Sequence, residues 1–507
     1  MPDLILDACV VTNLCRGSLP EINTILIARS NAGFRNWISI RQQAEILESV
    51  IKFATERGDQ DPSRSARESL ERVLEYCMWL SALSIEGDNL RDRDPTAYSL
   101  SYAASRIGKE TCVLTTDCKR LNRGNPFIDV ATVQKLDIQQ SVEFIDLETQ
   151  QDQIRPQLEH NLHKILHHSQ YVMGPEVFQL EEELAKYIGV EHCVCVSSGT
   201  DALLIAMMAL DLKPGDEVIT TPFTFFATAE TIILLGAKPV YVDIDKRTYT
   251  LDPSLVEAAI NERTKAILPV SMFGQCADMD RINEIADSYQ IPVIEDAAQS
   301  FGATYKGRHS CNLGQIGCTS FFPAKPLGAY GDAGACFTQD SQLAERIREI
   351  RDHGQSGRYD HVSIGINGRM DTLQAAVLLA KLDIFEEELN SRAQVAENYS
   401  ELLKPAENSG CLTLPGLEPH NISSWAQYTV EVNQRSYIQN MLSEKGIPTA
   451  VHYPQPMYKQ PATVESITHC PVTDRAVGRV LSLPMHPYLT IQTQERVVDS
   501  LNQALNF

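Results

Sequence analysis

Lys325 is the residue of this sequence whose type and setting most clearly suggest chemistry. It lies in the segment SFFPAKPLG, where an apolar run of strand type ends in a turn marked by proline and glycine. Lysine is the nucleophile that condenses with aldehydes, and to attack it must be neutral, which burial or a nearby cation favours. Most turn lysines are solvated, so Lys325 is a candidate only if other functional groups converge on it.

A carboxylate precedes this lysine in the chain. Asp296 ends the apolar run PVIED, and an acid at the end of a buried strand lies at the sheet edge where α/β proteins bind ligands. Such a carboxylate could pair with a protonated ring nitrogen, which in a pyridoxal enzyme keeps the ring cationic and able to accept electrons. Asp296 could equally cap the helix that follows.

A third segment, SSGTDAL, could bind a phosphate group. It follows the strand-like CVCV and opens the helix-like ALLIAMMAL. The first N–H groups of a helix have no partner within it and attract anions, and the hydroxyls of Ser198 and Thr200 could add donors. Serine and threonine are also ordinary N-cap residues, so a plain cap remains an alternative.

The elements that must position these residues alternate from residue 142 onward. Helical patterns cover Gln151–His168 and Val177–Ile188. Strand-like runs then alternate with helices: CVCVSS, DEVITTP, PVYVDID, KAILPV, PVIEDA and GCTSFFP. This predicts an α/β domain over 142–385 with a mostly parallel sheet covered on both faces. From 386 to 507 the pattern is mixed and ends in a helix over Gln492–Leu505, which predicts a smaller subdomain.

Composition and charge exclude several functional classes. The net charge is −22, and residues 1–141 hold 17 Lys+Arg against 19 Asp+Glu, so −20 falls in residues 142–507 and argues against non-specific nucleic-acid binding there. No apolar run approaches the roughly 18 residues of a membrane helix. The start, MPDLILDACVV, lacks the basic region of a signal peptide. The 13 cysteines show no CxxC pair or zinc spacing, which predicts free thiols and a cytoplasmic protein.

In their order and spacing, these segments resemble the sugar aminotransferases of the DegT/DnrJ/EryC1/StrS family. The resemblance runs from about Phe144 to the C-terminus. It is carried by GPEVFQLEEELAKYIG, VSSGTDAL, PFTFFATAE, EDAAQSFGA, SFFPAKPLGAYGDAGA, GINGRMDTLQAA and VLSLPMHPYLT. It implies the PLP-dependent transferase fold type I, in which helices sandwich a mostly parallel sheet beside a smaller C-terminal α/β subdomain. It also implies pyridoxal 5'-phosphate (PLP) as the cofactor.

The resemblance assigns roles to individual positions. Lys325 matches the Schiff-base lysine, and Asp296 matches the partner of the pyridine nitrogen. The other implied cofactor contacts are Gly199, Thr200 and Ser320 at the phosphate, Phe225 stacked on the ring, Gln299 near the ring hydroxyl, and Asn367 at the phosphate of the neighbouring subunit's cofactor. The implied substrate contacts are His452, Tyr453 and Arg369, and Arg369 could equally hold structure. A shared active site implies a homodimer.

The resemblance also implies a reaction. An amino group moves from glutamate to a nucleotide-linked keto-sugar, Lys325 moves protons as general acid and base, and ping-pong kinetics follow. The run LGAYGDAGA after Lys325 is similar to that of members that aminate C3 of the sugar, above all those that act on UDP-2-acetamido-3-keto-glucuronate in surface-polysaccharide synthesis. Members without the lysine are dehydratases, and Lys325 argues against that activity.

Residues 1–141 lack this pattern and are similar to a PIN domain, the metal-dependent ribonuclease fold. A strand-type run over 3–14 precedes helical patterns through about residue 80 and over Ala97–Ile107, and the strand-like TCVLTTD follows. The candidate ligands for Mg²⁺ or Mn²⁺ are Asp7, Glu45 and Asp117. A fourth acid usual in the family is replaced near Ala97, so three alternatives stay open: an active nuclease, a degenerate relative that binds without cutting, and a structural or oligomerising extension. The balance of charges is compatible with RNA but does not require it.

Two functional classes are therefore compatible with the whole chain. The favoured one is a sugar-nucleotide aminotransferase with an accessory domain. The alternative is a regulatory or RNA-acting protein, in which the PIN-like part is a metal-dependent ribonuclease and the aminotransferase-like part is a sensor.

Overall fold

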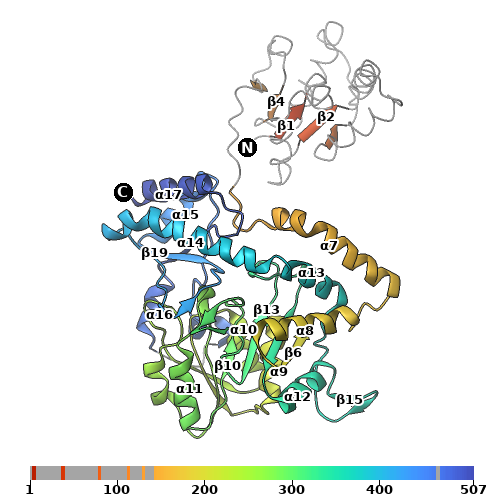
Figure 1. Cartoon of the computed structure of the whole chain (residues 1–507). Helices are drawn as coiled ribbons and strands as arrows, with labels where there is room; N and C mark the ends of the chain where they lie inside the picture. Colours follow the sequence, from red (N-terminus) through yellow and green to blue (C-terminus); the bar gives the residue numbers. More distant parts are fainter. Residues whose placement is uncertain are drawn as a thin grey trace. The chain divides into compact units, whose positions relative to one another are not determined.

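The chain folds into two compact units, residues 1–141 and 142–507. The computed structural model describes residues 142–463 and 469–506 and, in the first unit, five strands alone (Figure 1). These strands are β1 (Asp3–Leu6), β2 (Asn36–Ser39), β3 (Met78–Leu80), β4 (Thr111–Leu114) and β5 (Ile128–Ala131). They form one parallel sheet in the order β3-β2-β1-β4-β5.

The predictions for the first unit are met in part. The strand expected in TCVLTTD is present as β4, and β1 occupies the start of the expected run over 3–14. The helical reading of the segment up to residue 80 is wrong at its end, because Met78–Leu80 pairs with β2 as a strand. β2 was not predicted. The expected helix over Ala97–Ile107 lies outside the described residues.

A seven-stranded sheet forms the centre of the second unit. Its strands are β6 (His192–Val196), β7 (Glu217–Thr220), β8 (Lys238–Tyr241), β9 (Thr264–Leu268), β10 (Ile294–Asp296), β13 (Ile316–Ser320) and β14 (Gly334–Thr338). Two strand groups, β8-β7-β9 and β10-β13-β14-β6, join through parallel bridges between Ile267 and Val293 and between Val270 and Asp296. β14 runs antiparallel to both neighbours, and the other pairs are parallel. The predicted mostly parallel sheet is therefore confirmed.

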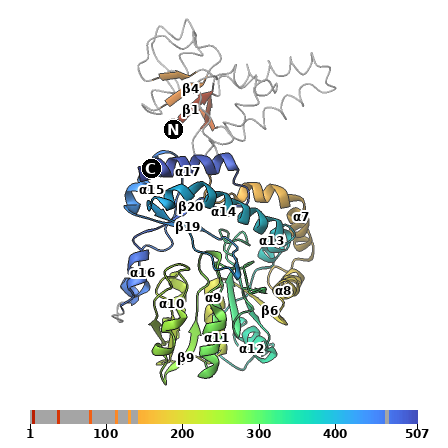
Figure 2. The same cartoon turned by 60° about the vertical axis from the view of Figure 1, so that its left-hand side comes forward.

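Helices cover both faces of this sheet because its strands are apolar on both faces. In β6, Cys193 and Cys195 pack against α8 (Pro175–Ile188) and α13 (Thr372–Leu382). Val194 and Val196 of the same strand point the other way, against α9 (Gly199–Ala209) and α12 (Ser341–Arg351). The helices α10 (Phe226–Leu234) and α11 (Met279–Ser288) complete this layered arrangement (Figure 2).

The long helix α7 (Leu147–His168) leads into the sheet domain and packs on α13. It begins one turn earlier than the predicted Gln151, because the carboxylate of Asp146 caps it by accepting the N–H of Thr149 at 2.9 Å. α8 likewise begins at Pro175, a residue suited to the first helical turn. It ends at Gly189, whose φ of 78° is the left-handed cap conformation.

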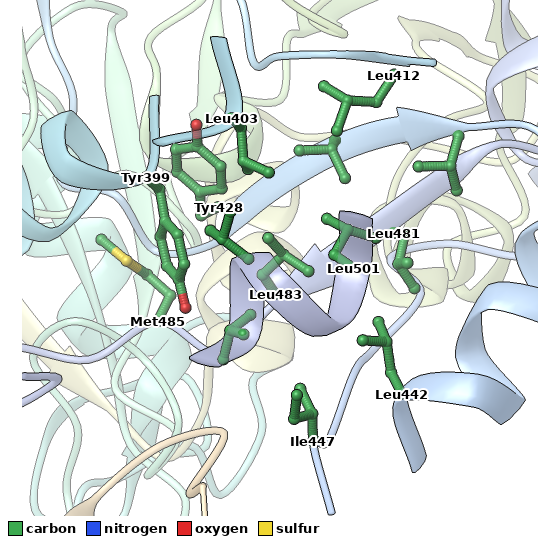
Figure 3. Packing of buried hydrophobic residues seen from close by; sticks show 14 of the residues in the cluster. Tyr399, Leu403, Leu412, Tyr428, Leu442, Ile447, Leu481, Leu483, Met485 and Leu501 are labelled. Atoms are coloured by element: carbon green, nitrogen blue, oxygen red, sulfur yellow. The ribbon is translucent and has the colours of Figure 1, made fainter. Parts of the chain in front are cut away.

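The C-terminal part of the second unit has a core cluster of its own, and we call it the C-terminal subdomain; it begins with α14 (Phe385–Asn408). Its antiparallel sheet, β17-β19-β20, is built from Leu412–Thr413, Tyr428–Val432 and Val480–Leu483. The helices α15 (Arg435–Glu444) and α17 (Ile491–Leu505) pack with α14 over this sheet. Their apolar faces enclose a core that includes Tyr399, Leu403, Leu442 and Leu501 (Figure 3). The short α16 (Pro471–Ala476) packs elsewhere, since its Ala476 joins a cluster with Phe223 and Tyr249.

Smaller elements complete the second unit. β11 (Thr304–Tyr305), β12 (Arg308–His309) and β18 (Asn421–Ile422) form one small sheet, and β15 (Gln355–Gly357) with β16 (Asp360–His361) forms a hairpin. Short 3-10 turns connect the other elements, at Pro253–Leu255, Glu257–Ala259, Met272–Gly274, Met457–Lys459 and Pro461–Thr463. In the part of the chain that the structure describes, no helix is long and apolar enough to cross a membrane.

Candidate active site

The three motifs singled out in the sequence meet at one edge of the large sheet. β10 ends at Asp296, β13 ends at Ser320, and β6 ends at Val196, just before the SSGTDAL segment. These three strands point the same way, because β6 and β13 are both antiparallel to β14 and β10 is parallel to β13. Their carboxyl ends therefore form a common edge, which is where α/β sheets place ligands.

The N-terminus of α9 forms a small cradle of backbone N–H groups. Ser198 caps the helix, since its Oγ accepts the N–H of Asp201 at 3.0 Å and its carbonyl oxygen accepts the N–H of Ala202 at 3.0 Å. This leaves the first N–H groups, those of Gly199 and Thr200, without an acceptor inside the helix. The cap and the phosphate-site interpretations of this segment are thus compatible.

Glycine is required at the start of α9 because β13 passes very close to it. A Cβ atom placed on Gly199 would lie 2.6 Å from Cβ of Ser320, closer than real side chains approach. The hydroxyl of Ser320 lies 3.2 Å from the same point. The start of α9 at Gly199 and the end of β13 at Ser320, which were assigned together with Thr200 from the sequence, therefore lie in direct contact.

Asp296 is a buried carboxylate with two hydrogen-bond donors. Its side chain accepts the hydroxyl of Thr228 on α10 at 2.8 Å and the N–H of Ala298 at 3.2 Å. Burial raises the pKa of Asp296 above its usual range, and the two hydrogen bonds and the positive charge of Lys325 oppose that rise. Thr228 was not predicted from the sequence, because nothing in PFTFFATAE distinguishes it from Thr224.

Lys325 lies in a turn after β13, where its N–H donates to the carbonyl of Phe322 at 2.8 Å. The residue is partly buried, and burial of its ammonium lowers the pKa of Lys325 to about 8 against the opposing charge of Asp296. Burial lowers the pKa of His452 to about 4, and the positive charge of the nearby Lys325 adds to this shift. At neutral pH, His452 is therefore neutral, and Lys325 has an accessible neutral form.

Two aromatic side chains, Phe225 and Tyr453, lie close together near Gln299. Gln299 accepts the N–H of Phe273 at 3.0 Å and donates from Nε2 to Oη of Tyr453 at 3.0 Å. The ring of Tyr453 lies 5.9 Å from that of Phe225, at an interplanar angle of 42°. Phe225 is 57% exposed although it is large and apolar, so its ring is available to stack on another planar group.

Two predicted site residues direct their side chains to other partners, although the backbone of Arg369 bridges to Val196 at the end of β6. Arg369 pairs through Nη1 with the carboxylate of Asp352, and its buried Nε has no hydrogen-bond partner among the described residues. This ion pair favours the structural interpretation of Arg369. Asn367 is exposed, and its backbone bridges to Asp352. Its assigned role concerns a neighbouring subunit and stays a prediction.

The predicted metal ligands Asp7, Glu45 and Asp117 lie outside the described residues. Across the ranges 142–463 and 469–506, no group of three or more His, Cys, Asp or Glu side chains could hold a metal ion. A cavity of about 520 Å³ in this part of the chain lies away from Lys325, between α7, α8 and α13, and the chemistry above does not involve it.

The residues at the sheet edge fit a phosphorylated aldehyde with a basic aromatic ring. The N–H groups of Gly199 and Thr200, which have no acceptor inside α9, suit the phosphate, and the buried Asp296 suits a ring nitrogen that must stay protonated. The amine of Lys325 suits the aldehyde, because its lowered pKa makes the neutral form accessible. The exposed ring of Phe225 suits stacking. PLP has this set of groups.

Comparison with known proteins agrees with this chemistry. Residues 152–502 match the model of the DegT/DnrJ/EryC1/StrS aminotransferase family. The chain is 57% identical over 348 residues to the UDP-2-acetamido-2-deoxy-3-oxo-D-glucuronate aminotransferase of Pseudomonas aeruginosa, a match that covers 69% of this chain and 96% of that enzyme.

Two crystal structures extend the comparison to the fold. A DegT/DnrJ/EryC1/StrS aminotransferase from Brucella abortus superposes with a TM-score of 0.69 at 40% identity, covering 71% of this chain and 98% of that one. The NtdA protein of Bacillus subtilis, crystallised with bound cofactor PMP, superposes with a TM-score of 0.67 at 32% identity, covering 72% of this chain and 83% of that one. PMP is the amine form of PLP, which is the cofactor of this family.

Proposed function

The chain belongs to the DegT/DnrJ/EryC1/StrS aminotransferase family, and from this premise we propose that it transfers an amino group from glutamate to C3 of a UDP-linked 3-keto-uronate. The observation that carries the proposal is the 57% identity to the Pseudomonas enzyme over 96% of that enzyme's length. The run LGAYGDAGA beside Lys325 supports amination at C3. Synthesis of a surface polysaccharide is the process that would use such an amino sugar.

Residues at the sheet edge would hold the cofactor. Gly199, Thr200 and Ser320 would bind its phosphate, Asp296 its ring nitrogen, and Phe225 one face of its ring. Gln299 would lie near the ring hydroxyl, with its amide already oriented by Tyr453. When bound, PLP supplies an aldehyde that takes up amino groups and a ring that withdraws electrons from the bonds that are broken.

The amine of Lys325 would act as the general acid and base of the reaction. A group that both accepts and returns a proton works best when its pKa lies near the working pH. Burial brings the pKa of Lys325 to about 8, well below the ordinary value for lysine. His452, held neutral beside Lys325 and hydrogen-bonded through Nδ1 to Ser482 at 3.2 Å, would orient the sugar without competing for that proton.

The proposal is tested by mass spectrometry of the products from UDP- and dTDP-linked keto-sugars, with glutamate, glutamine and aspartate as donors. We expect UDP-2-acetamido-3-keto-glucuronate and glutamate to give a product in which an amino group replaces the keto oxygen. Lys325→Ala is the matched control and should give none. Amination of 4-keto-sugars alone would contradict the assigned carbon, and turnover of no sugar would contradict the substrate class.

The aminotransferase interpretation and the alternative of a metabolite sensor also differ in a spectroscopic property. Purified protein with PLP should show the visible absorbance of the lysine-bound cofactor, and this band should disappear in Lys325→Ala. Addition of glutamate should convert the band to that of the amine form. A protein that binds PLP but leaves the band unchanged with every donor would favour the sensor.

A homodimer with shared active sites is part of the same proposal. The exposed side chain of Asn367, in the segment GINGRMD, supports a contact with the phosphate bound by a second copy of the chain. The cysteines of the described part carry no disulfide, which supports a reducing, cytoplasmic compartment.

For residues 1–141, we infer a PIN-like domain in which Asp7, Glu45 and Asp117 hold Mg²⁺ or Mn²⁺ and act on RNA. Support comes from the parallel pairing of β1 with β4, because Asp7 directly follows β1 in the sequence and Asp117 follows β4 by three positions. Incubation of a labelled RNA with Mn²⁺ tests the inference. Cleavage by the wild type and not by Asp7→Asn is expected, and equal background cleavage by both would exclude nuclease activity.

A further inference from the structure

Lys381 on α13 is a completely buried lysine. Its exposed fraction is 0%, and its Nζ has no hydrogen-bond partner among the residues that the structure describes. The nearby carboxylate of Glu388 is already occupied, since it accepts two hydrogen bonds of 2.9 Å from Gln150 and a further one from Tyr488. An unpaired ammonium is costly to bury, so its position needs a reason.

The contact that Lys381 does make is with an aromatic ring. Its Nζ lies 4.4 Å from the ring centroid of Tyr330, which is within the range of a favourable cation–π interaction. Burial lowers the pKa of Lys381 to about 8, and the charge of Glu388 opposes the shift, so the ammonium form still predominates at neutral pH. Such contacts contribute most when the partners are shielded from water, and here Lys381 is fully buried and Tyr330 is half-buried.

A second residue of the same helix holds Tyr330 by its backbone. The N–H of Tyr330 donates to Oε1 of Gln374 at 2.9 Å. Gln374 and Lys381 are about two turns apart on α13 and so lie on the same face of the helix. The next residue, Gly331, leaves room for this amide, because a Cβ there would lie 2.9 Å from Nε2 of Gln374. α13 therefore contacts Tyr330 twice, at its backbone through Gln374 and at its ring through Lys381.

Tyr330 belongs to the same compact loop as Lys325. The N–H of Phe321 donates to the carbonyl of Ala333 at 2.8 Å, and the N–H of Ala329 donates to the carbonyl of Phe321 at 2.7 Å. These bonds close the loop around Lys325, and a Cβ on Gly328 would lie 2.5 Å from the carbonyl oxygen of Pro323. A loop packed this tightly transmits a displacement of Tyr330 to the segment that carries Lys325.

We propose that Lys381 is a positioning residue whose ammonium, by holding the ring of Tyr330, fixes the loop that presents Lys325 to its reaction partner. The inference rests on the proposed role of Lys325 but concerns a different property, the rigidity of residues 321–333. Lys381 acts through Tyr330 and does not touch the cofactor or the substrate.

Hydrogen–deuterium exchange of the full chain without cofactor tests the proposal independently of catalysis. The peptide that covers residues 321–333 should exchange about tenfold faster in Lys381→Met, which keeps a side chain of similar length and removes the charge. Tyr330→Leu should have the same effect, whereas Tyr330→Phe, which retains the ring face, should exchange like the wild type. The double variant Lys381→Met/Tyr330→Leu should exchange no faster than either single variant, because both remove one contact.

Leu442→Ala is the control for general destabilisation, because Leu442 lies in the separate core of the C-terminal subdomain. It should lower the melting temperature and leave the 321–333 peptide unchanged. In the PLP-loaded protein, Lys381→Met should also alter the visible circular dichroism of the cofactor and lower kcat with little change in KM. Unchanged exchange of the peptide in Lys381→Met, or additive effects in the double variant, would overturn the proposal even if the aminotransferase activity is as proposed.

Discussion

The hydroxyl of Thr228 donates a hydrogen bond of 2.8 Å to Oδ2 of Asp296, joining residues that lie 68 positions apart in the chain. Asp296 is 4% exposed, and its burial favours the protonated form of the carboxyl. The hydroxyl of Thr228 and the N–H of Ala298 favour the charged form, which is the form that can pair with a protonated ring nitrogen. α10 therefore supports the charge of an acid that lies on another element.

Replacement of Thr228 by valine removes this donor and preserves the shape of the side chain. The loss of a hydrogen bond to a buried charged group costs roughly 1.5–3 kcal/mol, so the pKa of Asp296 should rise further and the affinity for PLP should fall by about tenfold or more. Equilibrium dialysis with PLP measures the affinity. Thr228→Ser keeps the hydroxyl and should bind like the wild type, and equal affinity in Thr228→Val would show that this bond does not support the site.

The reactivity of Lys325 should depend on pH in the cofactor-free protein. Burial lowers its pKa from 10.5 to about 8, so the neutral amine becomes the major form above pH 8, where an ordinary lysine stays charged. The rate at which Lys325 condenses with a small aldehyde should rise as the pH increases towards 8 and then level off. Stopped-flow absorbance with Lys325→Ala as the blank measures this rate.

Asp296→Asn provides the matched variant for that experiment. The negative charge of Asp296 raises the pKa of Lys325, so its removal should move the midpoint of the profile to lower pH. A midpoint that stays in place would mean that the two side chains are further apart in solution than in the structure. A midpoint near 10.5 in the wild type would contradict the burial of the ammonium.

The close approach of α9 to β13 predicts a strong effect of one methyl group. In Gly199→Ala the new Cβ would lie 2.6 Å from Cβ of Ser320, and overpacking of this kind costs about 1–3 kcal/mol. We expect a lower melting temperature and a loss of PLP affinity, because the helix must move away from the phosphate space. Gly357→Ala is the control, since a Cβ there meets nothing within 4 Å. Equal PLP affinity in the two variants would place the phosphate elsewhere.

The central sheet could be predicted because the patterns that indicate it lie within short segments of the sequence. Apolar runs alternate with helical periodicity, and this alone implied a covered, mostly parallel sheet with Asp296 at a strand end. Successive side chains of a strand point to opposite faces of the sheet, and this separates the adjacent acids Glu295 and Asp296. Glu295 points away from Asp296 and accepts hydrogen bonds from the hydroxyl of Ser310 and the N–H of Cys311, at 2.7 and 2.9 Å.

Other features could not be predicted because they depend on contacts between distant segments. Thr228 is an ordinary helical threonine until the fold brings it to Asp296, and Lys381 resembles a solvated lysine until α13 is buried. The direction of β14 is set by its neighbours and not by its own sequence. Met78–Leu80 continues a helical apolar pattern, yet pairing with β2 makes it a strand.

An active site built from two subunits leads to a prediction that does not follow from a site built from one subunit. If Asn367 completes the phosphate site of the neighbouring subunit, Asn367→Asp should abolish PLP retention, because its negative charge would repel the phosphate. Lys325→Ala should abolish the activity of the site in its own subunit, because Lys325 serves that site. Each variant alone would then be inactive.

A mixture of the two variants should regain activity. In a heterodimer, one of the two sites combines an intact Lys325 from one subunit with an intact Asn367 from the other. After random exchange of subunits, half of the dimers are mixed and each has one good site, so about a quarter of the wild-type activity should return. The activity is measured after co-refolding or co-expression. A mixture that stays inactive, while size measurements confirm that mixed dimers form, would place Asn367 in the same site as the Lys325 of its own chain.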